Sequence, residues 1–273
     1  MPGWVALIMQ LMTAALAVTY LVTAPIIAYA IFSRLAWRGR ASWVLIGVGF
    51  MLLALIPQVI TQGIPILIVL LTHIREVMIG GVSSITDLVL GLIKSSFYLM
   101  AIYMGLMAGV FQEAFRYLAI RDREPGSAPY IGYGFALVDL AFAMMGLVLP
   151  LLIPASVNPG IEYANVISTI GLVGIAVQPI VSILFHLGSS MVLKTYQALN
   201  KGFRGLILMV LAHAYMDSFT WYMDNAVALA IINSSLIMPL STVYFTSVVS
   251  LSAFIFIIGF RAFNYVIHRA HFN

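Results

Sequence analysis

The sequence predicts an all-α bundle of about seven or eight transmembrane helices, and three observations favour that class. Of the 273 residues, 63% are hydrophobic and only 8% are charged. The mean hydropathy of +1.08 is typical of a polytopic membrane protein. The apolar residues form continuous runs long enough to cross a bilayer as helices, whereas a membrane barrel would show short alternating segments. We therefore expect residues 1–273 to form a single transmembrane domain.

The composition also excludes several kinds of site and partner. The chain has no cysteine, which excludes disulfides, thiolate metal sites and cysteine nucleophiles. The net charge of +4 is small, and the basic residues gather near the ends of the apolar runs. That distribution fits the positive-inside bias of membrane proteins better than nucleic-acid binding. The start of the chain lacks the basic region of a cleaved signal peptide, so we expect it to begin the first span.

The first predicted span covers residues 4–32 and contains Pro25, and the second covers residues 42–61. Between them lies a basic loop that contains Arg34, Arg38 and Arg40. Because loops rich in arginine remain in the cytoplasm, we expect the N-terminus to lie outside the cell membrane. We expect helix breakers to end the second span, namely Pro57, Gly63 and Pro65.

Residues 64–94 are harder to assign. Their first apolar run, residues 64–71, is too short to span a bilayer alone, and charged residues and Gly80-Gly81 follow it. We expect short interfacial or re-entrant helices here, with an eighth span as the alternative. The other predicted spans cover residues 95–120, 130–153, 167–193, 205–222 and 237–260. Basic residues flank the spans at 121–123, 194–204 and after 260, which predicts a cytoplasmic C-terminus.

The stretch from Gly105 to Ile120 carries charge deep in an apolar run. Ala101, Gly105, Gly109 and Glu113 recur every fourth residue, and Arg116 follows three residues later, so they share one helical face. The small residues would let a neighbouring helix approach closely, and the carboxylate would then face the inside of a bundle. An alternative is a Glu113–Arg116 pair at the membrane edge with a purely structural role.

Few polar residues lie within the predicted spans: Gln112, Glu113, Arg116, Asp139, Gln178, His186, His213 and Asp217. Three chemistries remain open for them. His186, His213 and Glu113 could bind a divalent metal such as Zn²⁺, since imidazole and carboxylate suit that ion. Glu113 could instead activate a water while the histidines stabilise an oxyanion. The third option is a proton or ion relay.

Three short motifs resemble those of the YhfC family of intramembrane metalloproteases, which is related to the CAAX-protease and bacteriocin-processing (ABI, or CPBP) superfamily. The first is FQEAFRYLAI at residues 111–120, in which Glu113, Arg116 and Tyr117 match the family pattern. The others are LFH at residues 184–186, followed by Ser190, and LAH at residues 211–213, followed by Asp217. The likeness extends from about residue 50 to the C-terminus, with the motifs in a core at residues 95–225.

The chain also departs from that family at several positions. Gln112 stands where the family has its first glutamate, which is thought to activate the attacking water, and an amide cannot act as that base. Phe135 stands where the family has a histidine, and Asp139 follows where it has a glutamate. Gln178-Pro179 replaces an acidic and a basic residue. Degenerate motifs of this kind are typical of a fold that has lost its original chemistry.

Three interpretations therefore remain. The chain is an intramembrane endopeptidase that cleaves a membrane-protein or peptide substrate, a pseudoprotease that serves as a subunit of a larger membrane complex, or a small transporter. For an active protease, the resemblance implies four catalytic residues, which are Glu113, His186, His213 and Asp217. The residues expected to support them are Gln112, Arg116, Asp139 and Ser190. If Glu113 is the base, a glutamate restored at position 112 should raise activity.

Overall fold

The computed structural model describes residues 3–35, 41–152, 161–229 and 231–270, and these residues form eight helices and no strand. The all-α prediction is thus confirmed. The helices are α1 (Gly3–Leu35), α2 (Ala41–Thr72), α3 (Ile74–Ser95), α4 (Phe97–Arg121), α5 (Ser127–Leu152), α6 (Ile161–Ala198), α7 (Gly202–Ala228) and α8 (Ser234–Ala270). Seven are long and apolar enough to cross a membrane; α7, which carries His213 and Asp217, is the exception.

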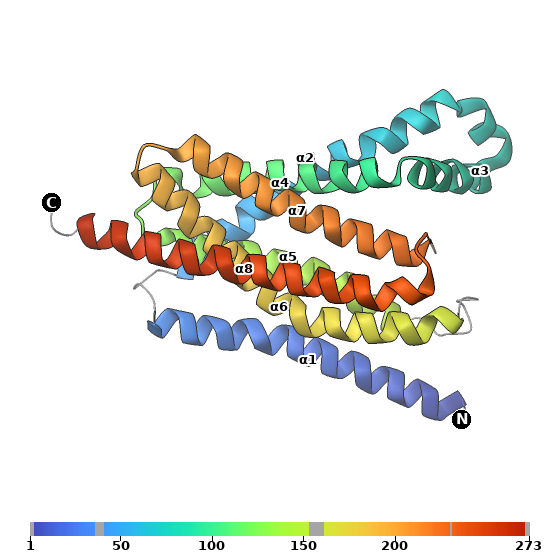
Figure 1. The fold of residues 1–273 in the computed structure, drawn as a ribbon, viewed down its shortest axis with the longest axis horizontal. Coiled ribbons are helices and arrows are strands. Elements are labelled where there is room, and N and C mark those ends of the chain that lie inside the picture. The colour runs from blue at the N-terminus through green and yellow to red at the C-terminus, as the bar shows by residue number, and fades with distance from the viewer. Residues whose placement is uncertain (1–2, 36–40, 153–160, 230, 271–273) are drawn as a thin grey trace.

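The helices other than α3 lie side by side in an up-and-down bundle, and α3 is set apart from it (Figure 1). The chain leaves α2 and enters α4 at the same end of the bundle, so α3 turns back at that end rather than crossing it. A left-handed glycine inside α3, Gly81 with φ 58°, breaks the helix into two pieces. Residues 64–72 belong to α2, and α3 meets the length and apolarity of a span, so a re-entrant placement of residues 64–94 stays a prediction beside the alternative of an eighth span.

The second helix is longer than expected, because α2 continues to Thr72 through Pro57 and Pro65. A proline has no N–H, so Pro65 leaves the carbonyl of Thr61 without its helical donor. The hydroxyl of Tyr103, on α4, donates to that carbonyl over 2.6 Å. Prolines are tolerated in membrane helices where a neighbour supplies such a partner, which explains why the expected end near residue 61 was wrong.

The small residues of α4 bring α7 close, as expected from their spacing. A Cβ atom added at Gly105 would lie 2.2 Å from the hydroxyl of Ser218, and one added at Gly109 would lie 2.6 Å from the carbonyl of Val210. Real Cβ atoms do not approach other atoms so closely, so only glycine fits at either position. The same face of α4 carries Glu113 one turn later, and the carboxylate therefore enters the bundle between its helices.

One end of the bundle gathers several basic segments. The α4–α5 loop, the α6–α7 loop and the C-terminus lie at that end, and the N-terminus lies at the other (Figure 1). Within it, the Lys194 ammonium is buried and donates to the carbonyls of Ile120 and Arg121 over 2.9 and 3.2 Å. Arg38 and Arg40 lie outside the described residues. The basic segments thus gather at one end, and the side of the membrane that this end faces stays a prediction.

Candidate functional site

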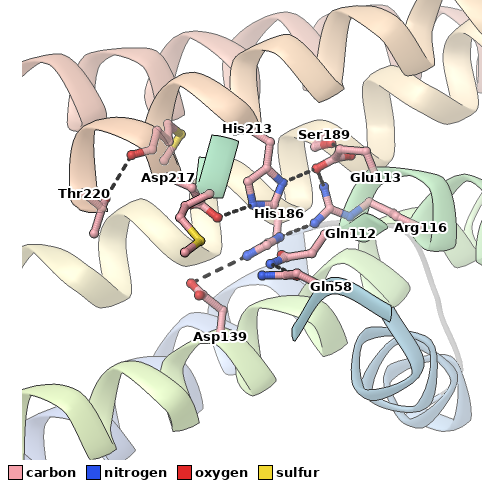
Figure 2. Close-up of polar contacts among 12 residues, drawn as sticks. Gln58, Gln112, Glu113, Arg116, Asp139, His186, Ser189, His213, Asp217 and Thr220 are labelled. Atoms are coloured by element: carbon pink, nitrogen blue, oxygen red, sulfur yellow. Dashed lines mark hydrogen bonds and ion pairs between the residues drawn. The ribbon is translucent and has the colours of Figure 1, made fainter. Parts of the chain in front are cut away.

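Glu113 lies at the centre of a buried polar network, with no exposed surface (Figure 2). Its Oε1 accepts from Arg116 Nη1 over 2.5 Å and from His213 Nδ1 over 2.7 Å. Its Oε2 accepts from the hydroxyl of Ser189 over 2.7 Å. Both carboxylate oxygens are thus engaged by donors from three helices, α4, α6 and α7. Such satisfaction is what a charge needs in a water-poor interior.

Arg116 completes the ion pair and binds the second histidine. Its Nη1 holds Glu113, and its Nη2 donates to Nδ1 of His186. The guanidinium lies over the ring of Phe135, 4.7 Å from the ring centroid, an arrangement favourable for a cation. Phe135 is therefore the aromatic support of Arg116 at the position where the resembled family has a histidine.

The ion pair gives the two histidines opposite hydrogen-bonding roles. An arginine can only donate, so Nδ1 of His186 must accept, and the proton of a neutral ring is then on Nε2. A carboxylate accepts, so Nδ1 of His213 must donate to Glu113, and a neutral ring then keeps a lone pair on Nε2. The two rings lie 5.7 Å apart between centroids. His186 thus presents a donor and His213 an acceptor on their outer sides.

Two further carboxylates lie beyond the histidines. His186 Nε2 is 3.6 Å from Asp139 Oδ2, and His213 Nε2 is 3.6 Å from Asp217 Oδ2 (Figure 2). Both distances exceed that of a normal hydrogen bond. The aspartate side chains are 34% and 37% exposed, whereas the histidines are buried. The carboxylates are therefore the members of the network that small molecules can reach.

A cavity of about 110 Å³ contains the outer sides of both histidines. Its walls come from α5, α6, α7 and α8 and include the residues Asp139, Gln178, Ser182, His186, His213, Asp217, Thr220 and Tyr244. Glu113 and Arg116 do not line it. The amide of Gln178 donates to Asp139 over 3.5 Å at the cavity wall. The space is polar and can accommodate several waters.

The four predicted catalytic residues thus come together, but they do not all face the cavity. His186, His213 and Asp217 line it, and Glu113 lies behind His213. The spacing of the motifs explains this convergence: His186 and Ser189 share a face of α6, and His213 and Asp217 share a face of α7. Their catalytic roles stay a prediction.

Two predicted supporting residues lie away from the cavity. Gln112 is buried and donates from its amide to Oε1 of Gln58, on α2, over 3.1 Å. The hydroxyl of Ser190 is buried with no hydrogen-bond partner, close to the backbone of Gly132. Arg116 and Asp139, the other two, belong to the network itself.

Sequence reasoning missed two contributors to this region, Gln58 and Tyr244. Gln58 had a detectable signal, because it is a polar residue inside an apolar span beside Pro57. Ser189 could be placed on the same helix face as His186 from its spacing, but its contact with Glu113 was not predicted. Tyr244 lies on α8, which carries none of the motifs, and no pattern in the sequence indicates it.

The contacts do not fit a zinc ion held by Glu113, His186 and His213. The Nδ1 lone pair of His186 is directed at a guanidinium, and the oxygens of Glu113 already accept from three donors. A metal would also lie beside the positive charge of Arg116. Among the residues that the structure describes, no group of three or more potential ligands is arranged to hold a metal.

Comparisons with protein-family models, with curated proteins and with solved structures found no match to this chain.

Proposed function

We propose that this integral membrane protein is an intramembrane hydrolase that cleaves peptide bonds at membrane depth. The observation that carries the proposal is the opposite polarity of His186 and His213 at one cavity, set by the Glu113–Arg116 pair. Hydrolysis needs a base for water and a donor for the developing oxyanion, and two oppositely polarised rings supply both. The resemblance to intramembrane proteases supports the same reaction class.

The proposed step begins when Nε2 of His213 accepts a proton from a water in the cavity. The resulting hydroxide attacks the carbonyl carbon of the scissile peptide, and the carbonyl oxygen accepts from Nε2–H of His186. When the tetrahedral intermediate collapses, the C–N bond breaks and His213 returns the proton to the leaving nitrogen. Glu113 fixes the tautomer of His213 and stabilises its charged form, the role that a carboxylate has behind a catalytic histidine. This assignment moves the base from Glu113 to His213.

The test is cleavage of a transmembrane-peptide library by purified wild type and by two variants, His213→Gln and His186→Gln. We expect His213→Gln to abolish cleavage, because it removes the base. We expect His186→Gln to retain a residual rate, because a glutamine amide can still donate to the oxyanion. Cleavage by His213→Gln at the wild-type rate would refute the proposal.

A pseudoprotease that serves as a subunit of a larger complex is the second candidate, and two contacts favour it. Gln112 pairs with Gln58 instead of facing the cavity, and every oxygen of Glu113 is already occupied. No free carboxylate therefore stands where the related proteases activate water. If no variant and no wild-type preparation cleaves any peptide, this candidate is favoured, and the protein should then copurify with a stoichiometric membrane partner.

A proton relay has less support, because Arg116 lies in the middle of the network. A guanidinium does not release its proton in proteins, so a proton cannot pass from His186 to Glu113 through it.

We also propose that the basic end of the bundle faces the cytoplasm of a cell-membrane protein. The chain has no native cysteine, so Asp122→Cys and Asn233→Cys each provide a single thiol. In intact cells an impermeant thiol reagent should label the cysteine at position 233 and not the one at 122. Labelling of both positions would reject this topology.

A further inference from the structure

The cavity is too small for the proposed substrate, so the bundle needs an entrance. A volume of about 110 Å³ holds waters, but not a peptide segment together with its side chains. The following inference rests on the proposed function for the identity of the substrate. The location of the entrance rests on how the four helices around the cavity pack.

Close backbone contacts hold two of these helices, α7 and α8, each to a different neighbour. A Cβ atom added at Gly188, on α6, would lie 2.6 Å from the backbone nitrogen of Phe256, on α8. A Cβ atom added at Gly259 would lie 2.6 Å from the carbonyl of Gly188. On the other side, Gly105 and Gly109 hold α7 against α4. Each of α7 and α8 is thus fixed to a different partner.

The contact between α7 and α8, by contrast, depends on side chains. We define the α7–α8 seam by Met216, Phe219 and Thr220 on α7 and by Tyr244, Val248 and Ser252 on α8. The hydroxyls of Thr220 and Tyr244 lie 2.8 Å apart, and the rings of Phe219 and Tyr244 meet edge to face at 5.2 Å. The hydroxyl of Ser252 lies 3.9 Å from the sulfur of Met216. Side-chain contacts of this kind can separate without a change in either helix.

The hydrogen bond in the seam has a definite direction. The hydroxyl of Thr220 already donates to the carbonyl of Met216 over 2.9 Å, so its single proton is used. The hydroxyl of Tyr244 is then the donor to Thr220. Removing the hydroxyl of either residue therefore removes the bond.

The seam lies well inside the bundle and beside the histidines. Thr220 precedes the end of α7 by eight residues and Tyr244 follows the start of α8 by ten, or about 12 and 15 Å along the helices. Both residues line the cavity and both are partly exposed. The next residue on the outer side of α8, Val243, is 57% exposed and suits a lipid-facing surface.

We infer that the α7–α8 seam is a lateral entrance for an apolar membrane-spanning segment of another protein, and that the Thr220–Tyr244 hydrogen bond closes it. The seam is lined by apolar and aromatic groups with three hydroxyls and no charged group, which suits a segment arriving from lipid rather than a charged solute. A segment that enters there meets His213 and Asp217 on α7 and His186 on α6.

The test uses a thiol inside the cavity and needs no catalysis, so its result is separate from that of the proposed function. Ser182 lines the cavity and is buried, and Ser182→Cys introduces a thiol of similar size into a chain without cysteine. In proteoliposomes, we measure its labelling rate with a lipid-soluble pyrenylmaleimide and with an impermeant quaternary-ammonium methanethiosulfonate. Both labelling rates are compared between the Ser182→Cys protein and the same protein carrying in addition Tyr244→Phe or Thr220→Val.

We expect both seam variants to raise the pyrenylmaleimide rate by about two- to tenfold, the effect of one neutral hydrogen bond on an opening equilibrium. The rate with the charged reagent should not rise. Tyr98→Phe is the matched control, since it removes an exposed tyrosine hydroxyl from α4 and should change neither rate. An unchanged pyrenylmaleimide rate in both seam variants would overturn the inference. Labelling of the Ser182→Cys protein that is faster with the charged reagent than with pyrenylmaleimide would overturn it as well.

Discussion

Glu113 and Arg116 form a 2.5 Å ion pair in which each partner also binds a different histidine. The carboxylate accepts a hydrogen bond from Nδ1–H of His213, and the guanidinium donates a hydrogen bond to Nδ1 of His186. The pair is fully buried and lies between helices from distant parts of the chain. Its role is therefore both to satisfy two buried charges and to define the state of two cavity-lining rings.

Glu113→Gln should destabilise the protein and abolish any hydrolysis. The substitution leaves the Arg116 guanidinium buried without its counter-charge, which costs about 3–5 kcal/mol. It also removes the group that fixes His213. The double variant Glu113→Gln, Arg116→Met removes both charges and should recover much of the stability without recovering activity. Chemical unfolding in detergent and peptide cleavage are the measurements, and a single variant as stable as wild type would contradict this account.

Gly109→Ala should lower both stability and activity, because its Cβ would lie 2.6 Å from the carbonyl of Val210 and push α7 away from α4. That displacement separates His213 from Glu113, one turn along the same helix face. Gly91→Ala is the control: its Cβ would meet no atom within 4 Å, and replacing a helical glycine by alanine gains about 0.5–1 kcal/mol. Melting temperatures that move in the same direction for both variants would argue against the tight α4–α7 contact.

Lys194→Met should destabilise the basic end of the bundle by about 1–3 kcal/mol. The Lys194 ammonium donates to the carbonyls of Ile120 and Arg121, in the last turn of α4, and of Arg123, just beyond it. Carbonyls at the end of a helix lack the regular donor four residues on and need partners from outside the helix. Lys201→Met removes an exposed charge from the neighbouring loop and should have little effect. Thermal unfolding compares the two, and equal small losses would show that the buried contacts contribute little.

The variant Gln112→Glu has different expected effects on activity under the family resemblance and under the observed contacts. The resemblance alone predicts higher activity, because the resembled family has a glutamate at this position. The geometry predicts lower stability and no gain, because the side chain faces Gln58 on α2 and would bury a carboxylate away from the cavity. Gln112→Leu is the comparison, since it removes the amide without adding a charge. A clear rise in cleavage by Gln112→Glu would favour the resemblance over the geometry.

The sequence predicted the helical class and the convergence of its motifs for clear physical reasons. Long apolar runs permit only helices in lipid, and the four-residue spacing of Gly105, Gly109 and Glu113 defines which face of α4 meets a neighbour. Polar residues at membrane depth need partners, so His186 and His213 could be expected to find Glu113 or Arg116.

The features that the sequence did not predict depend on contacts between residues distant in sequence. The end of α2 was misjudged because the partner of the orphaned Thr61 carbonyl, Tyr103, lies on another helix. The sequence also could not indicate which histidine would face the carboxylate and which the guanidinium. That choice follows from how α6 and α7 pack around α4.

The tautomers of the two histidines test the central claim most directly. ¹⁵N chemical shifts of histidine-labelled protein at neutral pH distinguish a proton on Nδ1 from a proton on Nε2, and the variants His186→Gln and His213→Gln assign the signals. We predict a neutral His213 protonated on Nδ1 and a neutral His186 protonated on Nε2. In the double variant Glu113→Gln, Arg116→Met, neither histidine should keep this preference for one tautomer. Two histidines in the same tautomer, or a His213 protonated on both nitrogens, would contradict the claim that the ion pair polarises them in opposite directions.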